Sequence, residues 1–120
     1  MDHLATRLES DPRVMLAVIF GSAMGGTVRD GSDVDIGVLL SPDPTPQEFY
    51  VFYQDMAARL GEIAELDLID LSRANSVLAF EVLRGRRLVV RDAEVVATFV
   101  SQTARQYEDD MLHADALRAA

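Results

Sequence analysis

Two apolar, strand-like segments joined by a short glycine-rich link restrict the fold of this chain most. The first segment, Val14 to Phe20, is too short for a helix, is rich in β-branched residues and ends at Gly21. The second runs from Asp33 to Leu40. The link between them holds four glycines and is too short for a crossover helix. We therefore expect these two strands to pair antiparallel.

The rest of the chain alternates between helical and strand-like patterns. Helices are expected over residues 2–9 and 46–60. A third helix is expected to be capped by Ser72 or Asn75 and to end at Arg84, and a long final helix is expected after Asp92. Two further strands are expected over residues 64–71 and 86–91. This order predicts the α/β (α+β) class, with a small mixed sheet of about four strands packed with helices. The last strand is expected at an edge, because arginines flank it.

Local signals define the ends of two helices. Thr45, Pro46 and Glu48 have the spacing of a capping box with proline at the first helical position. The apolar residues that follow at helical spacing are interpreted as core and not as a cofactor pocket: Phe49, Phe52, Tyr53, Met56 and Leu60. In the final helix the expected core stripe is Val95, Val96, Phe99, Val100 and Thr103, and the sequence becomes polar beyond Tyr107.

Composition narrows the class of protein and its partners. The 120 residues are enough for one domain, residues 1–120, with a single core. The absence of cysteine excludes thiolate catalysis and cysteine-based zinc sites. A net charge of -9 argues against nucleic acid as a partner. No apolar run is long enough for a membrane span, and the first residues do not resemble a signal peptide, so we expect a cytoplasmic protein with no membrane partner.

The link between the first two strands has the chemistry of a phosphate site. Gly21 has no Cβ, so the chain can turn sharply and bring the amide of Ser22 close to phosphate oxygens. The Ser22 hydroxyl adds a donor, and a helical turn near Ala23 and Met24 would add favourable partial charge. Gly21 and Ser22 are therefore the candidate residues for binding a nucleoside triphosphate.

Three aspartates are the candidate metal ligands and catalytic carboxylates. Asp33 and Asp35 are two apart on one strand, so both side chains leave the same face. Two such carboxylates suit two Mg²⁺ ions and the triphosphate of a nucleotide. Asp67 is the best third carboxylate, because it lies among apolar residues where an unpaired charge is costly. Two alternatives stay open: Asp33 as a turn residue, and an ion pair between Asp67 and Arg87.

With these residues in place, the chain resembles the minimal nucleotidyltransferase (MNT) antitoxin-type domains of the polymerase-β nucleotidyltransferase superfamily. The resemblance covers Val14 to about Asp92 and is carried by three segments: Phe20-Gly21-Ser22, Asp33-Val34-Asp35-Ile36 and Leu66-Asp67-Leu68-Ile69-Asp70-Leu71. It implies triphosphate binding by Gly21 and Ser22, and metal binding and catalysis by Asp33, Asp35 and Asp67. Many relatives are antitoxins paired with a HEPN-type RNase toxin, and some silence that toxin by transferring AMP from ATP to a tyrosine.

The sequence also departs from the pattern of many relatives, which is Gly-Ser-x-Ala-Arg-Gly. Here Gly25 stands at the arginine position, so one phosphate contact is missing. The leading hypothesis is a Mg²⁺-dependent protein adenylyltransferase of a toxin–antitoxin pair. The alternatives are a catalytically weak or inactive module that neutralises its partner sterically, and a nucleotidyltransferase for a small molecule such as an aminoglycoside. Assembly as a homodimer or a hetero-oligomer is also left open.

Overall fold

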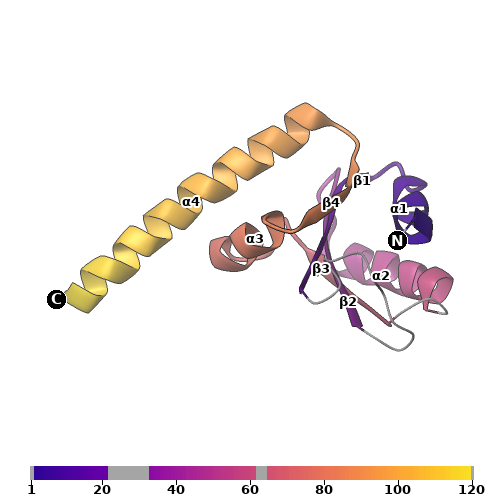
Figure 1. Cartoon of the computed structure of the whole chain (residues 1–120), viewed down its shortest axis with the longest axis horizontal. Helices are drawn as coiled ribbons and strands as arrows, with labels where there is room; N and C mark the ends of the chain where they lie inside the picture. Colours follow the sequence, from indigo (N-terminus) through magenta and orange to yellow (C-terminus); the bar gives the residue numbers. More distant parts are fainter. Residues whose placement is uncertain (1, 22–32, 62–64, 120) are drawn as a thin grey trace.

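The computed structural model of the chain describes residues 2–21, 33–61 and 65–119, with a four-stranded mixed sheet and four helices (Figure 1). The elements, in chain order, are α1 (Asp2–Glu9), β1 (Val14–Phe20), β2 (Asp33–Leu40), α2 (Pro46–Leu60), β3 (Glu65–Asp70), α3 (Ser76–Leu83), β4 (Arg86–Val90) and α4 (Ala93–Ala119). The predicted class and order of elements are confirmed. Ala64, expected at the start of the third strand, lies outside the described residues.

The sheet has the strand order β3-β2-β1-β4. The pair β1–β2 is antiparallel, as the short link between them predicts, and β1–β4 is also antiparallel. The pair β2–β3 is parallel, and α2 provides the crossover between these two strands. Strand β4 lies at one edge, as predicted, and β3 lies at the other.

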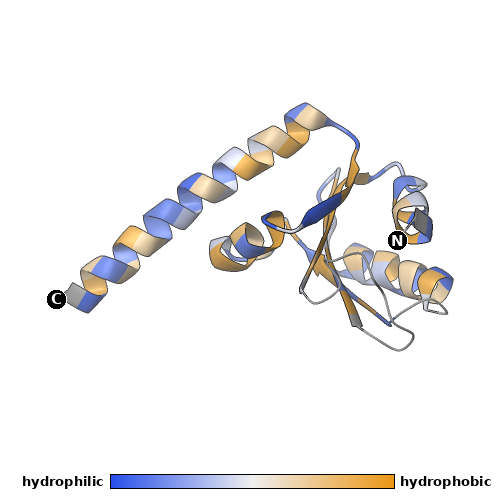
Figure 2. Ribbon diagram, viewed as in Figure 1, coloured by the Kyte–Doolittle hydropathy of each residue, from blue (hydrophilic) through white to orange (hydrophobic). Residues whose placement is uncertain are grey.

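The helices cover the two faces of the sheet with separate hydrophobic clusters. Helices α1 and α2 pack on one face, whereas α3 and α4 lie on the other, to the left in Figure 1. Alternate residues of β2 divide between the clusters: Val34, Ile36 and Val38 belong to the first, and Leu39 belongs to the second. Figure 2 shows the strands as mainly hydrophobic and α4 as mixed. The residues of the central strand β1 also divide between the two clusters, so this strand is buried on both faces.

The helix ends follow the signals in the sequence. At the start of α2 the Glu48 N–H donates to Thr45 Oγ1 (3.1 Å), and the Thr45 N–H donates to Glu48 Oε1 (2.9 Å), so the predicted capping box is present. For α3 the two predicted caps are resolved in favour of Asn75, whose Oδ1 accepts from the Leu78 N–H at 2.9 Å. Helix α2 ends at Leu60, and Gly61 caps it in the right-handed conformation.

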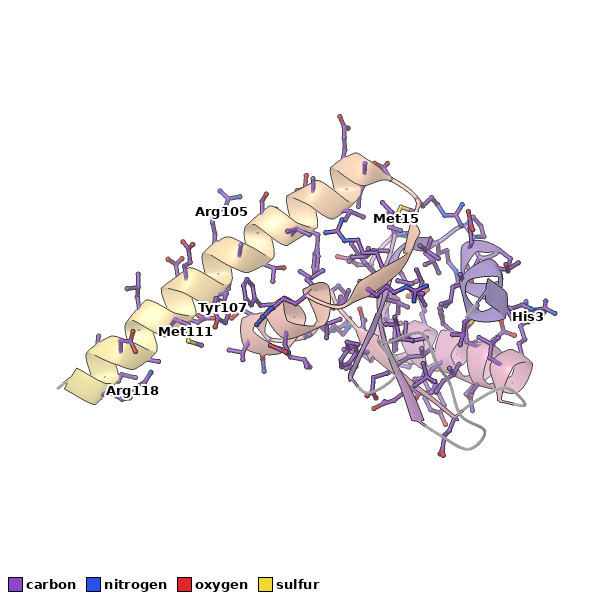
Figure 3. All side chains as sticks on the ribbon, viewed as in Figure 1. His3, Met15, Arg105, Tyr107, Met111 and Arg118 are labelled. Carbon is purple, nitrogen blue, oxygen red and sulfur yellow. The ribbon has the colours of Figure 1, made fainter. Side chains whose placement is uncertain are left out.

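The final helix is longer than its polar sequence suggests. Asp92 caps it as predicted, and the helix continues through Ala119. Tyr107 of α4 points toward α3 (Figure 3), where its ring stacks on Phe80 with centroids 4.2 Å apart, and the Ser76 hydroxyl donates to Asp110. These contacts extend the packing of α4 beyond the predicted stripe.

The stripe itself is confirmed in part. Val96 and Thr103 are buried, and Phe99 and Val100 pack against the second cluster. Val95 is 37% exposed, so its assignment to the core was wrong. No helix within the described ranges is long and apolar enough to cross a membrane.

Gly37, in the middle of β2, allows α3 to pack closely on the sheet. A Cβ at this position would lie 2.4 Å from Val82 Cγ1 and 3.2 Å from Leu71 Cδ2. The contact with Val82 is shorter than real Cβ atoms make and the contact with Leu71 is tight, so a methyl group here would push α3 away from the sheet. The absence of a side chain therefore sets how closely α3 approaches β2.

We predict that Gly37→Ala lowers the free energy of unfolding by about 1–3 kcal/mol, the usual cost of overpacking a core. Val82→Ala removes the obstructing methyl groups but leaves a cavity, so it is also destabilising. The double variant should lose clearly less than the sum of the two single losses, as measured by urea denaturation. Losses that add within about 0.5 kcal/mol would show that the two residues do not interact.

Candidate active site

Asp35 and Asp67 lie side by side on neighbouring strands. In the parallel pair β2–β3 they are direct register partners. Their neighbours Ile36 and Leu68, also partners, both face the α1–α2 cluster. Side chains alternate along a strand, so the two aspartates share the opposite face, with adjacent strands about 4.8 Å apart. Asp35 is half-buried and Asp67 is exposed. Two carboxylates predicted from separate segments are thus brought together.

Asp67 lies in a different environment from the one that its sequence predicts. The sequence placed this carboxylate among apolar residues, and burial without a partner was the argument for a catalytic role. In the structure Asp67 is exposed, because Leu66 and Leu68 take up the buried face of β3. The alternative ion pair with Arg87 is also wrong, since Arg87 lies on β4 at the other edge of the sheet. Its alignment with Asp35 is what makes Asp67 a candidate.

Gly21 lies directly against Asp35. It follows β1, whose last residue Phe20 is the register partner of Asp35. Gly21 has a φ of +73°, and a Cβ on it would lie 2.7 Å from Asp35 Oδ2. A side chain would therefore meet both backbone strain and a steric clash. Glycine at this position lets the backbone at the end of β1 lie close to the carboxylate.

The remaining predicted site residues are described only in part. Asp33 begins β2 as the register partner of Glu65, but its side chain lies outside the described residues. Ser22, the helical turn expected near Ala23 and Met24, and Gly25 also fall outside them. The predicted triphosphate site is thus represented in the structure by Gly21.

The chemistry of the described carboxylates suits a hard cation. Carboxylate oxygens are the ligands that Mg²⁺ prefers, and Mg²⁺ is usually held by one or two of them together with substrate phosphates. Among the side chains that the structure describes, no three His, Asp or Glu groups gather closely enough to hold an ion. Asp35 and Asp67 are two of the three predicted ligands, and the side chain of the third, Asp33, lies outside the described residues.

Tyr53 is a polar neighbour of the site that the sequence did not indicate. Its hydroxyl donates to the Leu66 carbonyl at 2.8 Å and lies 3.5 Å from Asp67 Oδ1. Burial raises the pKa of Tyr53, and the nearby negative charge of Asp67 raises it further, while hydrogen bonding by the Leu68 backbone lowers it. The sequence offered one signal: a tyrosine at a position of the α2 stripe whose neighbours Phe49 and Phe52 have no hydroxyl.

A cavity of about 520 Å³ lies elsewhere in the molecule. Its lining comes from the end of β2, the loop after it, Ser72 and the first turns of α4. The aspartates of β2 lie at the beginning of the strand, so the cavity is separate from the carboxylate pair. It does not contribute to the candidate site.

Comparison with known proteins identifies the class. Residues 2–94 match the family described as polymerase beta, nucleotidyltransferase. The match covers most of the chain, which therefore belongs to this nucleotidyltransferase family, as the resemblance in the sequence implied. The α/β fold with its four-stranded mixed sheet is the fold of this family.

Particular relatives come from toxin–antitoxin systems. The chain is 33% identical over 78 residues to the protein adenylyltransferase MntA of Shewanella oneidensis. The matched region covers 64% of this chain and 55%, about half, of MntA. A chain from a crystal structure of a toxin–antitoxin with AMP-PNP matches with a TM-score of 0.77 and 26% identity, over 98% of this chain and 95% of that one.

A further structure supports the fold. It is the tri-AMPylated Shewanella oneidensis HEPN toxin in complex with an MNT antitoxin, and a chain from it matches with a TM-score of 0.71 and 23% identity. The match covers 99% of this chain and 97% of that one.

We predict that Gly21→Ala lowers the free energy of unfolding by about 1–3 kcal/mol, the usual cost of a non-glycine residue at positive φ, and also displaces the Asp35 carboxylate. The measurement is urea denaturation together with Mn²⁺ binding, followed by electron paramagnetic resonance. In an Asp35→Ala background the same change should cost less, because the clash with Oδ2 is gone. Equal costs in both backgrounds would show that Gly21 does not control the position of Asp35.

Proposed function

We propose that residues 1–120 act as one minimal nucleotidyltransferase domain that transfers AMP from ATP to a hydroxyl of a partner protein. The partner is a HEPN-type toxin, and the chain is its antitoxin. One observation carries the proposal: Asp35 and Asp67 are register partners on one face of the sheet, beside the turn at Gly21. The kinship to MntA, named a protein adenylyltransferase, and to a toxin–antitoxin structure with AMP-PNP supports the choice of ATP and of a protein acceptor.

The roles of the residues follow from their positions. Gly21 and Ser22 bind the triphosphate through backbone amides and the serine hydroxyl. Asp33, Asp35 and Asp67 are the carboxylates that hold two Mg²⁺ ions. When bound, these ions neutralise charge on the phosphates and favour the ionised form of the acceptor hydroxyl.

The reaction is a displacement at the α-phosphorus. The acceptor oxygen forms a bond to this phosphorus, and the bond from the phosphorus to the bridging oxygen breaks, so that pyrophosphate leaves with the electron pair. The hydroxyl proton passes to Asp67, whose exposed carboxylate is accessible to a protein substrate. The half-buried Asp35 lies against the turn and is fixed more tightly, which suits a ligand that must keep its geometry.

The surface suits a protein partner. The net charge of -9 favours association with a basic protein. Helix α4 projects beyond α3 and exposes Leu112 and Leu117, which are 68% and 64% accessible. The negative charge and the exposed leucines of α4 also favour a second function, in which the chain binds and blocks its partner without transferring AMP. Gly25, in place of the arginine of many relatives, points the same way.

We predict that the protein labels its HEPN partner when incubated with α-labelled ATP and Mg²⁺, and that chelation of the metal abolishes labelling. Asp35→Ala should reduce the rate by about 10²–10³-fold, as expected when one group that stabilises transition-state charge is lost. The matched control is Asp43→Ala, an exposed aspartate in the loop after β2, which should label at the wild-type rate.

The same variants separate the two functions. If Asp33→Ala combined with Asp35→Ala neutralises the toxin as well as the wild type does, steric blocking accounts for the activity. Equal labelling by Asp35→Ala and wild type would contradict the proposed site.

A further inference from the structure

Strand β3, which carries Asp67, is an edge strand held from the side by a residue of α2. One edge of β3 pairs with β2, and the described residues place no strand on its other edge. There the Tyr53 hydroxyl donates to the Leu66 carbonyl at 2.8 Å. Unpaired carbonyls at a sheet edge otherwise bond to water. Tyr53 thus anchors the residue immediately before Asp67.

The same hydroxyl lies beside the Asp67 side chain. The Tyr53 oxygen is 3.5 Å from Asp67 Oδ1, at the long end of the hydrogen-bond range. A hydroxyl has one proton to donate, and the shorter distance shows that the Leu66 carbonyl is its main acceptor. Tyr53 therefore acts on Asp67 mainly by fixing the backbone and by limiting where the carboxylate can turn.

Tyr53 is itself held in place, which an anchor requires. Its ring is half-buried and packs against the α1–α2 cluster, one position after the buried Phe52. The position of the hydroxyl is thus set by the core of the domain.

From this geometry we infer that Tyr53 is a positioning residue for the third carboxylate, holding Asp67 in line with Asp35 by bonding to the edge of β3. The inference rests on the proposed function, because it assigns Asp67 to a metal and acceptor site. It makes Tyr53 the link between the hydrophobic core and the side of the site nearest the acceptor. Outer partners of metal-binding groups typically change affinity or rate by about 10–100-fold.

The test is Tyr53→Phe, which removes the hydroxyl and keeps the ring. We expect kcat for AMP transfer to fall about 10-fold and Mn²⁺ binding, measured by electron paramagnetic resonance without nucleotide, to weaken by a similar factor. The KM for ATP should change less than twofold, because the triphosphate contacts at the Gly21 turn are untouched. The circular dichroism spectrum should stay that of the folded wild type.

The matched control is Tyr50→Phe on the same helix. Tyr50 is 63% exposed and one turn away from Tyr53, so the loss of its hydroxyl should leave both readouts unchanged. A second comparison places Tyr53→Phe in an Asp67→Asn background. If Tyr53 acts through Asp67, it should have no further effect there.

The outcomes distinguish this inference from the proposed function. If the wild type transfers AMP and Tyr53→Phe matches Tyr50→Phe in both rate and Mn²⁺ binding, the inference is wrong and the function stands. If the wild type transfers no AMP, Mn²⁺ binding decides: a loss specific to Tyr53→Phe supports the anchor, and equal binding overturns it. Full additivity with Asp67→Asn would show that Tyr53 acts elsewhere.

Discussion

The register between β2 and β3 is the constraint on which the candidate site depends. Val34 and Ile36 of one strand and Leu66 and Leu68 of the other all point into the same hydrophobic cluster. A shift of β3 by one residue would turn Leu66 and Leu68 to the opposite face and bury the carboxylate of Asp67 instead. The hydrophobic core therefore aligns the aspartates, since burial of one face fixes what lies on the other.

The surrounding elements refine this alignment from three sides. Gly21, at the end of β1, lies so close to Asp35 that only glycine fits at this position. Helix α3 approaches the same face farther along β2, where Gly37 leaves room for Val82. On the outer edge, Tyr53 of α2 bonds to the strand that carries Asp67. Each contact depends on the presence or absence of a few atoms, so small substitutions should have measurable effects.

Most of the fold was predictable from the sequence because its signals are local. The capping box at Thr45, the apolar strand before Gly21 and the short link to β2 each depend on neighbouring residues, and each was confirmed. Long-range packing was harder to predict. Val95 has the right helical spacing for the core, but the adjacent Val96 is the buried residue of that turn, and Val95 is 37% exposed. The contacts of Tyr107 and Asp110 in α4 with Phe80 and Ser76 in α3 join residues far apart in the sequence, so no local pattern reveals them.

In the candidate site, too, local features were easier to predict from the sequence than long-range contacts. Asp35 and Asp67 were selected correctly as neighbours, yet for Asp67 the reason given, burial, was wrong. Composition along one strand does not say which of its faces will be covered. The sequence did not indicate the role of the Tyr53 hydroxyl. Helical periodicity identifies the face of α2 that packs on the core, but it does not show that a hydroxyl on this face reaches the edge of β3. Such contacts become visible only when the layers are assembled.

Anomalous diffraction from crystals grown with Mn²⁺ and a non-hydrolysable ATP analogue tests the central claim most directly. The account predicts two peaks about 3.5–4 Å apart, the spacing of paired catalytic ions, both within coordination distance of Asp35 or Asp67 and next to the turn at Gly21. Peaks bound elsewhere, or a nucleotide seated away from these two carboxylates, would contradict it.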